Sequence, residues 1–334
     1  MGRVTLADVA RLAGTSTAVV SYVVNNGPRP VAPGTRQRVE AAMLELGYRP
    51  NLIARALKSN RSNAVALVVP DISNAWFSLL AHSIEEAAYM RGLVLLLGSS
   101  GHSPDRERHQ LHTLAGLRVD GVILARSPLS RSRPRTDLRL DVPMVCVNRA
   151  GPRGTVIPSI VVDNAAGGAL ATRHLLGHGH AEIACLTGPA EAGPLADRAA
   201  GWRQALRQAD LDPAEDLLLR SGFGRLDAYE TVKSWLAHDD HPAALFCASD
   251  ELALGALRAA AETGTKVPEQ LAIVGFDDIA EANASYPPLT TVRQPVADIA
   301  AAAIELLLRI RDTGEPQQDL TFDVDLAVRG TCGC

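Results

Sequence analysis

The sequence lacks the features that mark membrane, exported and disulfide-rich proteins. No part of its 334 residues forms a run of about 18 apolar residues, the length that a membrane-spanning helix requires. The N-terminal stretch MGRVTLADVARLAG has no apolar signal core, so export is not expected. Only five cysteines occur, an odd number in a long chain, which argues against a disulfide framework. We therefore expect a cytoplasmic protein without membrane association.

The cysteines fall into two groups. Cys146, Cys185 and Cys247 lie within apolar runs typical of buried strands. Cys332 and Cys334 form a C-x-C pair, for which a metal or redox role is conceivable. A lone C-x-C pair without partner ligands more often has neither role, so no metal and no cofactor are expected.

Motifs of catalysis are missing as well. The chain has no nucleophile elbow and no phosphate-binding loop. Asp277–Asp278 and the pair His178-x-His180 suggest a metal hydrolase as the competing interpretation, but no third ligand lies at a suitable spacing. Judged by the groups that a catalytic site requires, the chain is not expected to be an enzyme.

Charge is unevenly distributed, although the net charge of the chain is only −4. Residues 1–62 contain nine Arg or Lys and three Asp or Glu, a net charge of +6, and the remaining residues carry −10. A small basic module attached to an acidic body indicates that the module alone contacts a polyanion. A solvated surface is the simpler explanation, and charge alone does not decide between the two.

The basic module has the pattern of a helix-turn-helix at residues 5–25. Thr5 is the expected N-cap of a first helix, and Gly14 its left-handed C-cap. Ser16 or Thr17 is the expected cap of a second helix. A third helix is expected to begin with Thr35 as its cap.

The spacing of small and apolar residues within residues 5–25 is more specific for a helix-turn-helix than for any two short helices. Ala10 is small where the helices approach, Gly14 permits the positive φ of the turn, and Val20 packs back onto the first helix. An ordinary helical hairpin is the alternative. If the second helix enters the major groove, its outward residues meet base edges while flanking polar residues hold phosphates. The DNA-binding candidates of the module are Thr5, Ser16, Thr17, Ala18, Ser21, Tyr22, Asn25 and Arg29.

From residue 64 onward, apolar runs of strand length alternate with amphipathic helical segments. The expected strands are 64–70, 93–98, 121–125, 143–148, 159–163, 183–188, 244–250 and 272–278, and helices such as 77–91, 104–117, 165–177, 195–209, 226–237 and 251–263 lie between most of them. Near-continuous apolar strands that alternate with helices predict a parallel sheet covered on both faces. The number of elements exceeds one such sheet, so two similar α/β lobes are expected. The stretch 127–141, mixed in Ser, Arg and Pro, is expected to form an exposed loop.

Several segments occur in an order typical of one known family. VTLADVARLAGTSTAVVSYVVN, TRQRVEAAMLELGYRPN, VALVVPDISNAWF, ASDELALGAL and AIVGFDDIAEA closely resemble segments of the LacI/GalR family of repressors. The resemblance covers nearly all of residues 1–330. It implies an all-α helix-turn-helix headpiece at 1–50, a hinge helix and linker at 51–62, and a core at 63–330 like that of periplasmic sugar-binding proteins.

The resemblance also implies how the core is divided. Three strand crossovers are expected near 161–165, 289–293 and 321–326. The N-terminal lobe should then comprise about 63–162 and 292–322, and the C-terminal lobe about 163–291 and 323–330. The family forms homodimers that read two half-sites of operator DNA, and the absence of a leucine heptad tail favours a dimer over a tethered tetramer.

Two positions concern how DNA is read. The family's hinge helix inserts a leucine into the minor groove, and Leu57, beside Lys58, matches that residue. Packing between domains is the alternative role of Leu57. Tyr22 stands where many family members carry an arginine that contacts guanine, so the operator is expected to differ from common family sites at that base pair.

The effector cleft implied by the resemblance has eight candidate residues: Trp76, Phe77, Asn148, Arg198, Phe223, Ser249, Asp277 and Gln294. Aromatic faces with carboxylate, amide and guanidinium groups suit a sugar-like ligand. Ser249 replaces a common asparagine, which disfavours a standard hexose without excluding it. Trp202 is expected in the hydrophobic core, and Asp250 and Asp278 as helix caps.

The implied function is that of a transcriptional repressor. Its operator affinity should change when the effector alters the relative orientation of the two lobes. The sequence does not indicate whether the effector releases or strengthens DNA binding. A plain solute-binding protein would have the same core, but the basic headpiece and the missing signal peptide argue against it.

Overall fold

The computed structural model of the chain describes residues 4–25, 29–49, 61–126, 141–150, 157–238, 240–315 and 318–334. These residues belong to two units, residues 1–62 and residues 63–334, which are described separately. Leu57 and Lys58 of the expected hinge, and residues 127–140 of the expected loop, lie outside the described residues.

The N-terminal unit contains α1 (Leu6–Leu12), α2 (Thr17–Asn25) and α3 (Pro33–Glu45). Thr5 caps α1: its hydroxyl accepts from the Asp8 N–H at 3.3 Å, and the Asp8 carboxylate accepts from the Thr5 N–H at 3.0 Å. The Ser16 hydroxyl accepts from the Val19 N–H at 3.3 Å and caps α2. Gly14 has a φ of +60°, as the turn between the helices requires. These caps confirm the predicted helix starts at Thr5 and Ser16.

The predicted start of the third helix is wrong. α3 begins at Pro33, and its N-cap residue Ala32 makes no side-chain hydrogen bond, so Thr35 is not its cap. A proline at the first position needs no hydrogen-bond acceptor and has a φ suited to a helix, which explains the earlier start. The three helices enclose a small apolar core of Val9, Ala10, Ala13, Val20, Val23, Val39 and Ala42.

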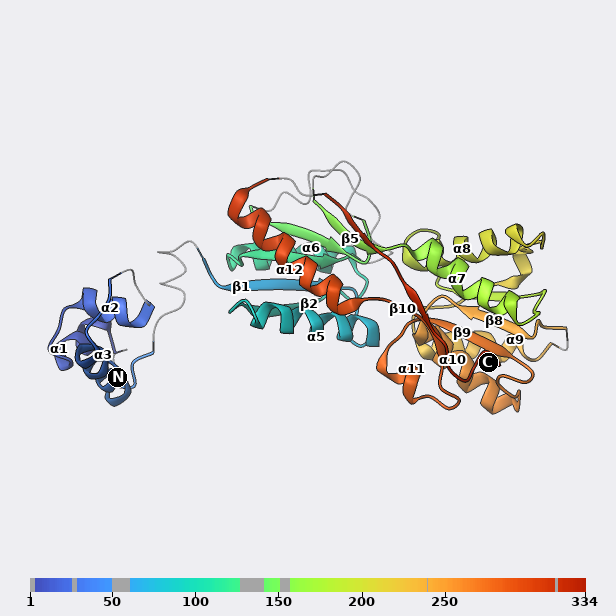
Figure 1. The fold of residues 1–334 in the computed structure, drawn as a ribbon, viewed down its shortest axis with the longest axis horizontal. Helices are drawn as coiled ribbons and strands as arrows, with labels where there is room; N and C mark the ends of the chain where they lie inside the picture. The colour runs from blue at the N-terminus through green and yellow to red at the C-terminus, as the bar shows by residue number, and fades with distance from the viewer. Residues whose placement is uncertain are drawn as a thin grey trace. The chain divides into compact units, whose positions relative to one another are not determined.

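The described residues of 63–334 form two six-stranded sheets, one in each lobe (Figure 1). The sheet of the N-terminal lobe has the order β11-β5-β4-β3-β1-β2. Its strands are β1 (Ala64–Val69), β2 (Val94–Ser99), β3 (Gly121–Ala125), β4 (Met144–Val147), β5 (Ser159–Val162) and β11 (Leu320–Phe322). All of its strand pairs are parallel.

The sheet of the C-terminal lobe has the order β12-β10-β9-β8-β6-β7. Its strands are β6 (Ala184–Thr187), β7 (Leu218–Arg220), β8 (Ala244–Cys247), β9 (Ala272–Asp277), β10 (Thr290–Arg293) and β12 (Asp325–Ala327). The pairs are parallel except β10 with β12, which is antiparallel. The segments around β5 and β10 carry the chain between the lobes in Figure 1.

Helices cover both faces of each sheet. Successive side chains of a strand point to opposite faces, so a strand that is apolar throughout has to be covered by helices on each face. Along β1, Val65 and Leu67 pack with α5 (Ala75–Tyr89) and α12 (Val296–Thr313), whereas Ala66 and Val68 pack with α6 (Pro104–Gly116). In the C-terminal lobe the helices are α7 (Asn164–Gly177), α8 (Pro194–Gln208), η1 (Glu215–Leu217), α9 (Arg225–Trp235), α10 (Asp250–Thr263) and α11 (Ala280–Ala284). The predicted fold class, a helical headpiece with doubly covered parallel sheets, is confirmed.

Within the described part of residues 63–334, the chain crosses between the lobes three times. The crossings lie at Asp163 between β5 and α7, at residues 294–295 between β10 and α12, and at residues 323–324 between β11 and β12. Residues 292 and 293 were expected in the N-terminal lobe, and they belong instead to β10 of the C-terminal sheet. Among the described residues, no helix has the length and apolar character needed to cross a membrane.

Candidate functional site

A cavity of about 910 Å³ lies between the two lobes of residues 63–334. Its wall includes residues that end or shortly follow strands of both sheets: Asp71, His102, Asn148, Ser249 and Asp277. Ligands of open α/β sheets bind at the carboxyl ends of the strands, where the loops leave a crevice. The volume is within the range of roughly 300–1,000 Å³ that is typical of small-molecule sites.

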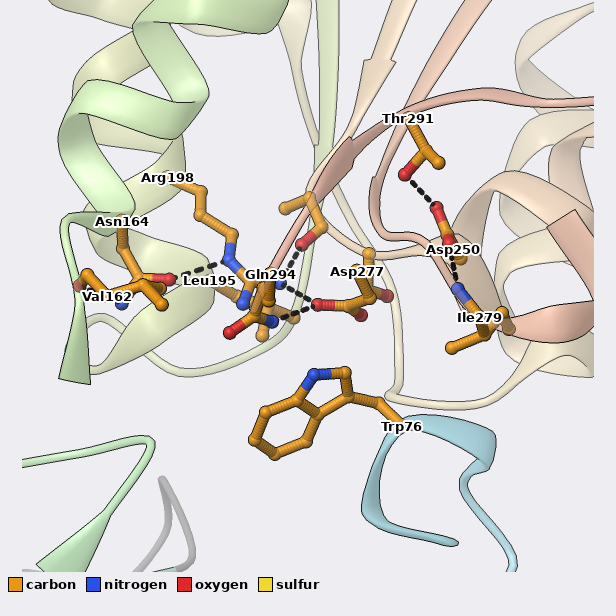
Figure 2. Close-up of polar contacts among 12 residues, drawn as sticks. Trp76, Val162, Asn164, Leu195, Arg198, Asp250, Asp277, Ile279, Thr291 and Gln294 are labelled. Atoms are coloured by element: carbon orange, nitrogen blue, oxygen red, sulfur yellow. Dashed lines mark hydrogen bonds and ion pairs between the residues drawn. The ribbon is translucent and has the colours of Figure 1, made fainter. Parts of the chain in front are cut away.

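Arg198, on α8, is held rigidly in the cavity wall. Its side chain is 3% exposed. It donates from Nε to Asn164 Oδ1 at 2.8 Å, and from Nη1 to the Ala248 carbonyl at 2.7 Å and to Asp277 Oδ1 at 3.0 Å (Figure 2). The guanidinium carbon also lies 3.6 Å from the centre of the Phe276 ring. Nη2 has no hydrogen-bond partner in the part of the chain that the structure describes, so it is the donor available to a bound molecule.

Close packing of α7 against α8 determines where Arg198 lies. A β-carbon on Gly168 of α7 would lie 2.0 Å from the Arg198 carbonyl oxygen. A β-carbon on Gly201 of α8 would lie 1.9 Å from the carbonyl oxygen of Ala165. Real β-carbons do not approach backbone this closely, so the two glycines are required for the helices to touch.

Asp277 ends β9 and faces Arg198. Its φ of 127° is uncommon for a residue other than glycine, and such strain is often found at functional sites. Gln294 also holds this carboxylate, because its Nε2 donates to Asp277 Oδ1, the oxygen that accepts from Arg198, at 2.7 Å. Burial raises the pKa of Asp277 to about 6, and the Arg198 guanidinium opposes that rise. Gln294 is not among the residues that line the cavity, and its described hydrogen bond is to Asp277.

Trp76 brings an unpaired donor to the same region. Trp76 and Phe77 begin α5, and the N-cap residue Asn74 accepts from both of their backbone N–H groups. Trp76 is 5% exposed, and its Nε1–H has no hydrogen-bond partner among the described residues. In Figure 2 this nitrogen faces the side chains of Arg198 and Asp277. A buried donor without a partner costs about 1–3 kcal/mol, so a ligand atom that accepts a hydrogen bond from Trp76 Nε1 would remove that cost and bind more tightly.

An aromatic pair joins the lobes beside the cavity. The rings of His102, which follows β2, and Phe223, which follows β7, are stacked with centroids 4.8 Å apart and an interplanar angle of 4°. Burial lowers the pKa of His102, so its imidazole is neutral at pH 7. His102 was not predicted, because nothing in the sequence shows that the end of β2 meets the end of β7.

Glu251 makes a second link between the lobes. Its Oε1 accepts from the Ala75 N–H, at the start of α5, at 3.2 Å. Arg225 donates two hydrogen bonds to the same carboxylate, from Nε to Oε2 at 2.7 Å and from Nη2 to Oε1 at 3.0 Å. A carboxylate at a helix N-terminus is also stabilised by the helix dipole. Glu251 and Arg225 line the cavity and were not predicted, since their meeting depends on how the lobes close.

Most of the predicted effector residues line the cavity. Ser249 lines it and also caps α10, since its hydroxyl accepts from the Leu252 N–H at 3.3 Å. Asn148 lines it from the end of β4, with a φ of 66°. The structure therefore brings together Trp76, Phe77, Asn148, Arg198, Phe223, Ser249 and Asp277.

Three residues were assigned other roles from the sequence. Trp202 is fully buried and donates from Nε1 to the Ile183 carbonyl at 2.9 Å, which confirms its core position. Asp250 was expected to cap a helix, but it is a buried acceptor of the Thr291 hydroxyl at 2.5 Å, with Ser249 as the cap. Asp278 was also expected as a cap. Instead its carboxylate pairs with Arg293, whose Nε lies 2.6 Å from Oδ2, and with Arg329, whose Nη2 lies 2.5 Å from Oδ1.

Apart from Leu57 and Lys58, which lie outside the described residues, the DNA-binding candidates lie on or beside α1 and α2 of the N-terminal unit. Ser16, Thr17, Ala18 and Asn25 are exposed, as are Thr5 and Arg29, whereas Ser21 and Tyr22 are half-buried. The Asn25 amide donates to the Ser21 carbonyl at 2.9 Å and to its hydroxyl at 3.2 Å. The outward face of α2 thus presents small and polar side chains, and no acidic residue occurs in its first turn.

Comparison with known proteins gives matches over both units. A family model described as bacterial regulatory proteins, lacI family, matches residues 5–51, and one described as a periplasmic binding protein-like domain matches residues 172–332. The HTH-type transcriptional repressor PurR of Vibrio campbellii is 35% identical over 329 residues, covering 98% of each chain. PurR of Aliivibrio salmonicida is 36% identical over 310 residues, covering 92% of each chain.

Solved structures match the same fold. The lac repressor dimer bound to operator and the anti-inducer ONPF has a TM-score of 0.86 at 28% identity, covering 99% of each chain. The complex of the transcriptional regulator CelR with cellobiose has a TM-score of 0.72 at 31% identity, covering 98% of this chain and 100% of the other.

Proposed function

Since the chain belongs to the lacI family of bacterial regulatory proteins, and is a DNA-binding transcriptional repressor rather than an enzyme, we propose that a small sugar-like effector binds in the cavity between its lobes and controls its operator affinity. The observation that carries this proposal is the unpaired Trp76 Nε1–H directed at the Arg198–Asp277 pair. Together these groups offer two donors and a carboxylate acceptor to a molecule in the cavity.

The chemistry of the wall supports a polyhydroxylated ligand. Hydroxyl groups both donate and accept, so one hydroxyl can donate to Asp277 while it accepts from Trp76 or Arg198. The Phe77 and Phe223 rings offer apolar surface for the C–H face of such a ligand. The solved CelR relative is a complex with cellobiose, which is consistent with a carbohydrate effector for this chain.

We further propose that α2 enters the major groove of the operator. Thr17, Ala18 and Tyr22 would then meet base edges, while Thr5, Ser16, Ser21, Asn25 and Arg29 would hold phosphates. Leu57, outside the described residues, remains the proposed minor-groove wedge, and Lys58 beside it remains a proposed DNA contact. A homodimer would place two copies of α2 on two half-sites. The solved lac repressor relative is a dimer bound to operator, which supports this proposal.

Two measurements test the proposal. Genomic fragments selected by the purified chain at moderate salt supply the operator, and no selected fragment would contradict the DNA-binding part. Calorimetric titration with a panel of mono- and disaccharides then identifies the effector. An effector whose affinity is unchanged by both Trp76→Phe and Arg198→Met would bind outside the cavity and contradict the effector part.

A further inference from the structure

A cluster of two histidines and two cysteines lies in the C-terminal lobe, and none of its members lines the cavity. His174 and His178 lie at the end of α7, and Cys332 and Cys334 belong to the Cys-Gly-Cys segment. The four candidate ligand atoms lie within 4.8 Å of one another. Cys334 Sγ is 3.0 Å from His178 Nε2, 3.6 Å from His174 Nε2 and 3.3 Å from Cys332 Sγ.

The local structure explains why these side chains converge. His174 and His178 are four residues apart, so they lie on one face of the helix end, one turn apart. Their rings meet edge to face, with centroids 4.8 Å apart. Gly333 has a φ of 89°, a conformation that glycine adopts freely, and it lets the chain turn between the two cysteines.

The cysteine segment is anchored by hydrogen bonds to the sheet. The Thr331 hydroxyl donates to the Ile273 carbonyl at 2.6 Å and accepts from the Thr290 N–H at 2.9 Å. The Thr290 hydroxyl in turn donates to Cys332 Sγ at 3.1 Å. Hydrogen bonds from outer groups orient metal ligands and stabilise a thiolate. Cys332 is therefore held in place before any metal binds.

The distances fit a metal better than a disulfide. Zinc lies about 2.3 Å from sulfur and about 2.0–2.1 Å from nitrogen, so the ligand atoms of a tetrahedral site are separated by roughly 3.3–3.8 Å. The separations of 3.0 to 3.6 Å around Cys334 Sγ are close to this range. A disulfide needs about 2.05 Å between the sulfurs, and both cysteines are free.

The donor set identifies the class of metal. Thiolate and imidazole ligands select Zn²⁺ over Mg²⁺ and Ca²⁺, which prefer oxygen. Four protein ligands leave no open position for substrate, which is the arrangement of a structural zinc site. We propose that His174, His178, Cys332 and Cys334 bind one Zn²⁺ and that this ion fastens the Cys-Gly-Cys segment to the end of α7.

Metal analysis of the untagged, full-length chain purified under reducing conditions tests this proposal. We expect one zinc per chain by elemental mass spectrometry. After chelation, Co²⁺ should restore a metal complex with thiolate-to-cobalt charge-transfer absorption and the visible bands of tetrahedral Co²⁺. His178→Ala and Cys334→Ser replace exposed side chains, so the fold should persist. Each should weaken zinc binding at least about 100-fold, since even the loss of an outer-shell partner costs 10- to 100-fold.

His180→Ala is the matched control, because His180 lies in the same turn but outside the cluster. It should keep the zinc of the unmodified chain. Chelation should also lower the melting temperature of the unmodified chain and of His180→Ala, but not that of Cys334→Ser. The proposal is overturned by an unmodified chain that binds neither zinc nor Co²⁺, by zinc retained in both ligand variants, or by a Cys332–Cys334 disulfide in place of the metal.

Discussion

Replacing Trp76 by phenylalanine should weaken effector binding while it changes the stability of the unliganded chain little. The substitution keeps an aromatic ring beside Phe77 and removes the buried Nε1–H, which has no partner among the described residues. A neutral hydrogen bond contributes about 0.5–1.5 kcal/mol, so the effector should bind roughly 2- to 12-fold more weakly. The unliganded chain no longer buries an unsatisfied donor, so its free energy of unfolding should not fall by more than about 1 kcal/mol, despite the smaller ring.

Calorimetric titration measures the first quantity and urea unfolding the second. Trp235→Phe is the matched control, because Trp235 is only partly buried and lies outside the cavity wall. That variant should bind the effector with unchanged affinity. Unchanged effector affinity in Trp76→Phe, or equal losses in both tryptophan variants, would refute the role of the indole N–H.

Three further predictions concern the helix contact, a buried carboxyl and the hinge. Gly168→Ala should lower the free energy of unfolding in urea by about 1–3 kcal/mol, because the added β-carbon meets the backbone of α8. Gly177→Ala, on the same helix, adds a β-carbon in open space and should change it by less than about 0.5 kcal/mol. Similar losses in both variants would contradict the tight contact between α7 and α8. Burial raises the pKa of Asp250 to about 7 from the ordinary 3.8, so the native state holds the proton more tightly and stability should fall as the pH rises from about 4 to about 7. Urea unfolding across this range should show a smaller fall in Asp250→Asn, and an undiminished fall would exclude Asp250 as its source. Leu57→Ala should weaken operator binding much more than binding to non-specific DNA in a gel shift, and equal losses would exclude a minor-groove wedge.

Local sequence signals were enough to predict the elements that depend on local chemistry. The caps at Thr5 and Ser16 and the turn at Gly14 follow from side chains and φ angles that each residue brings with it. Eight strands of the core were predicted because buried parallel strands are almost continuously apolar. The short strands β7, β10, β11 and β12, of three or four residues each, were not predicted. The prediction that Thr35 caps the third helix was wrong, because a threonine near a helix start resembles a cap even where Pro33 begins the helix.

Contacts between distant segments could not be predicted in this way. The stacking of His102 on Phe223 and the bond from Ala75 to Glu251 arise only when the two lobes meet. Seven of the effector candidates that the resemblance implies line the cavity, whereas Gln294 donates to Asp277, a contact that no spacing in the sequence reveals.

The Cys-x-Cys pair shows the same limit of sequence patterns. It was set aside because no partner ligands lay nearby in the sequence. His174 and His178 reach it only through the packing of α7 beside the segment that carries Cys332.

The most direct test of the proposed function is the operator affinity measured with and without saturating effector. Fluorescence anisotropy on one labelled operator, at one fixed salt concentration, gives both dissociation constants. We expect the effector to change the operator Kd by about 5- to 150-fold, and operator DNA to change the effector Kd by the same factor, because coupling between two sites is reciprocal. An effector that occupies the cavity yet leaves the operator Kd unchanged would contradict the proposed control of DNA binding.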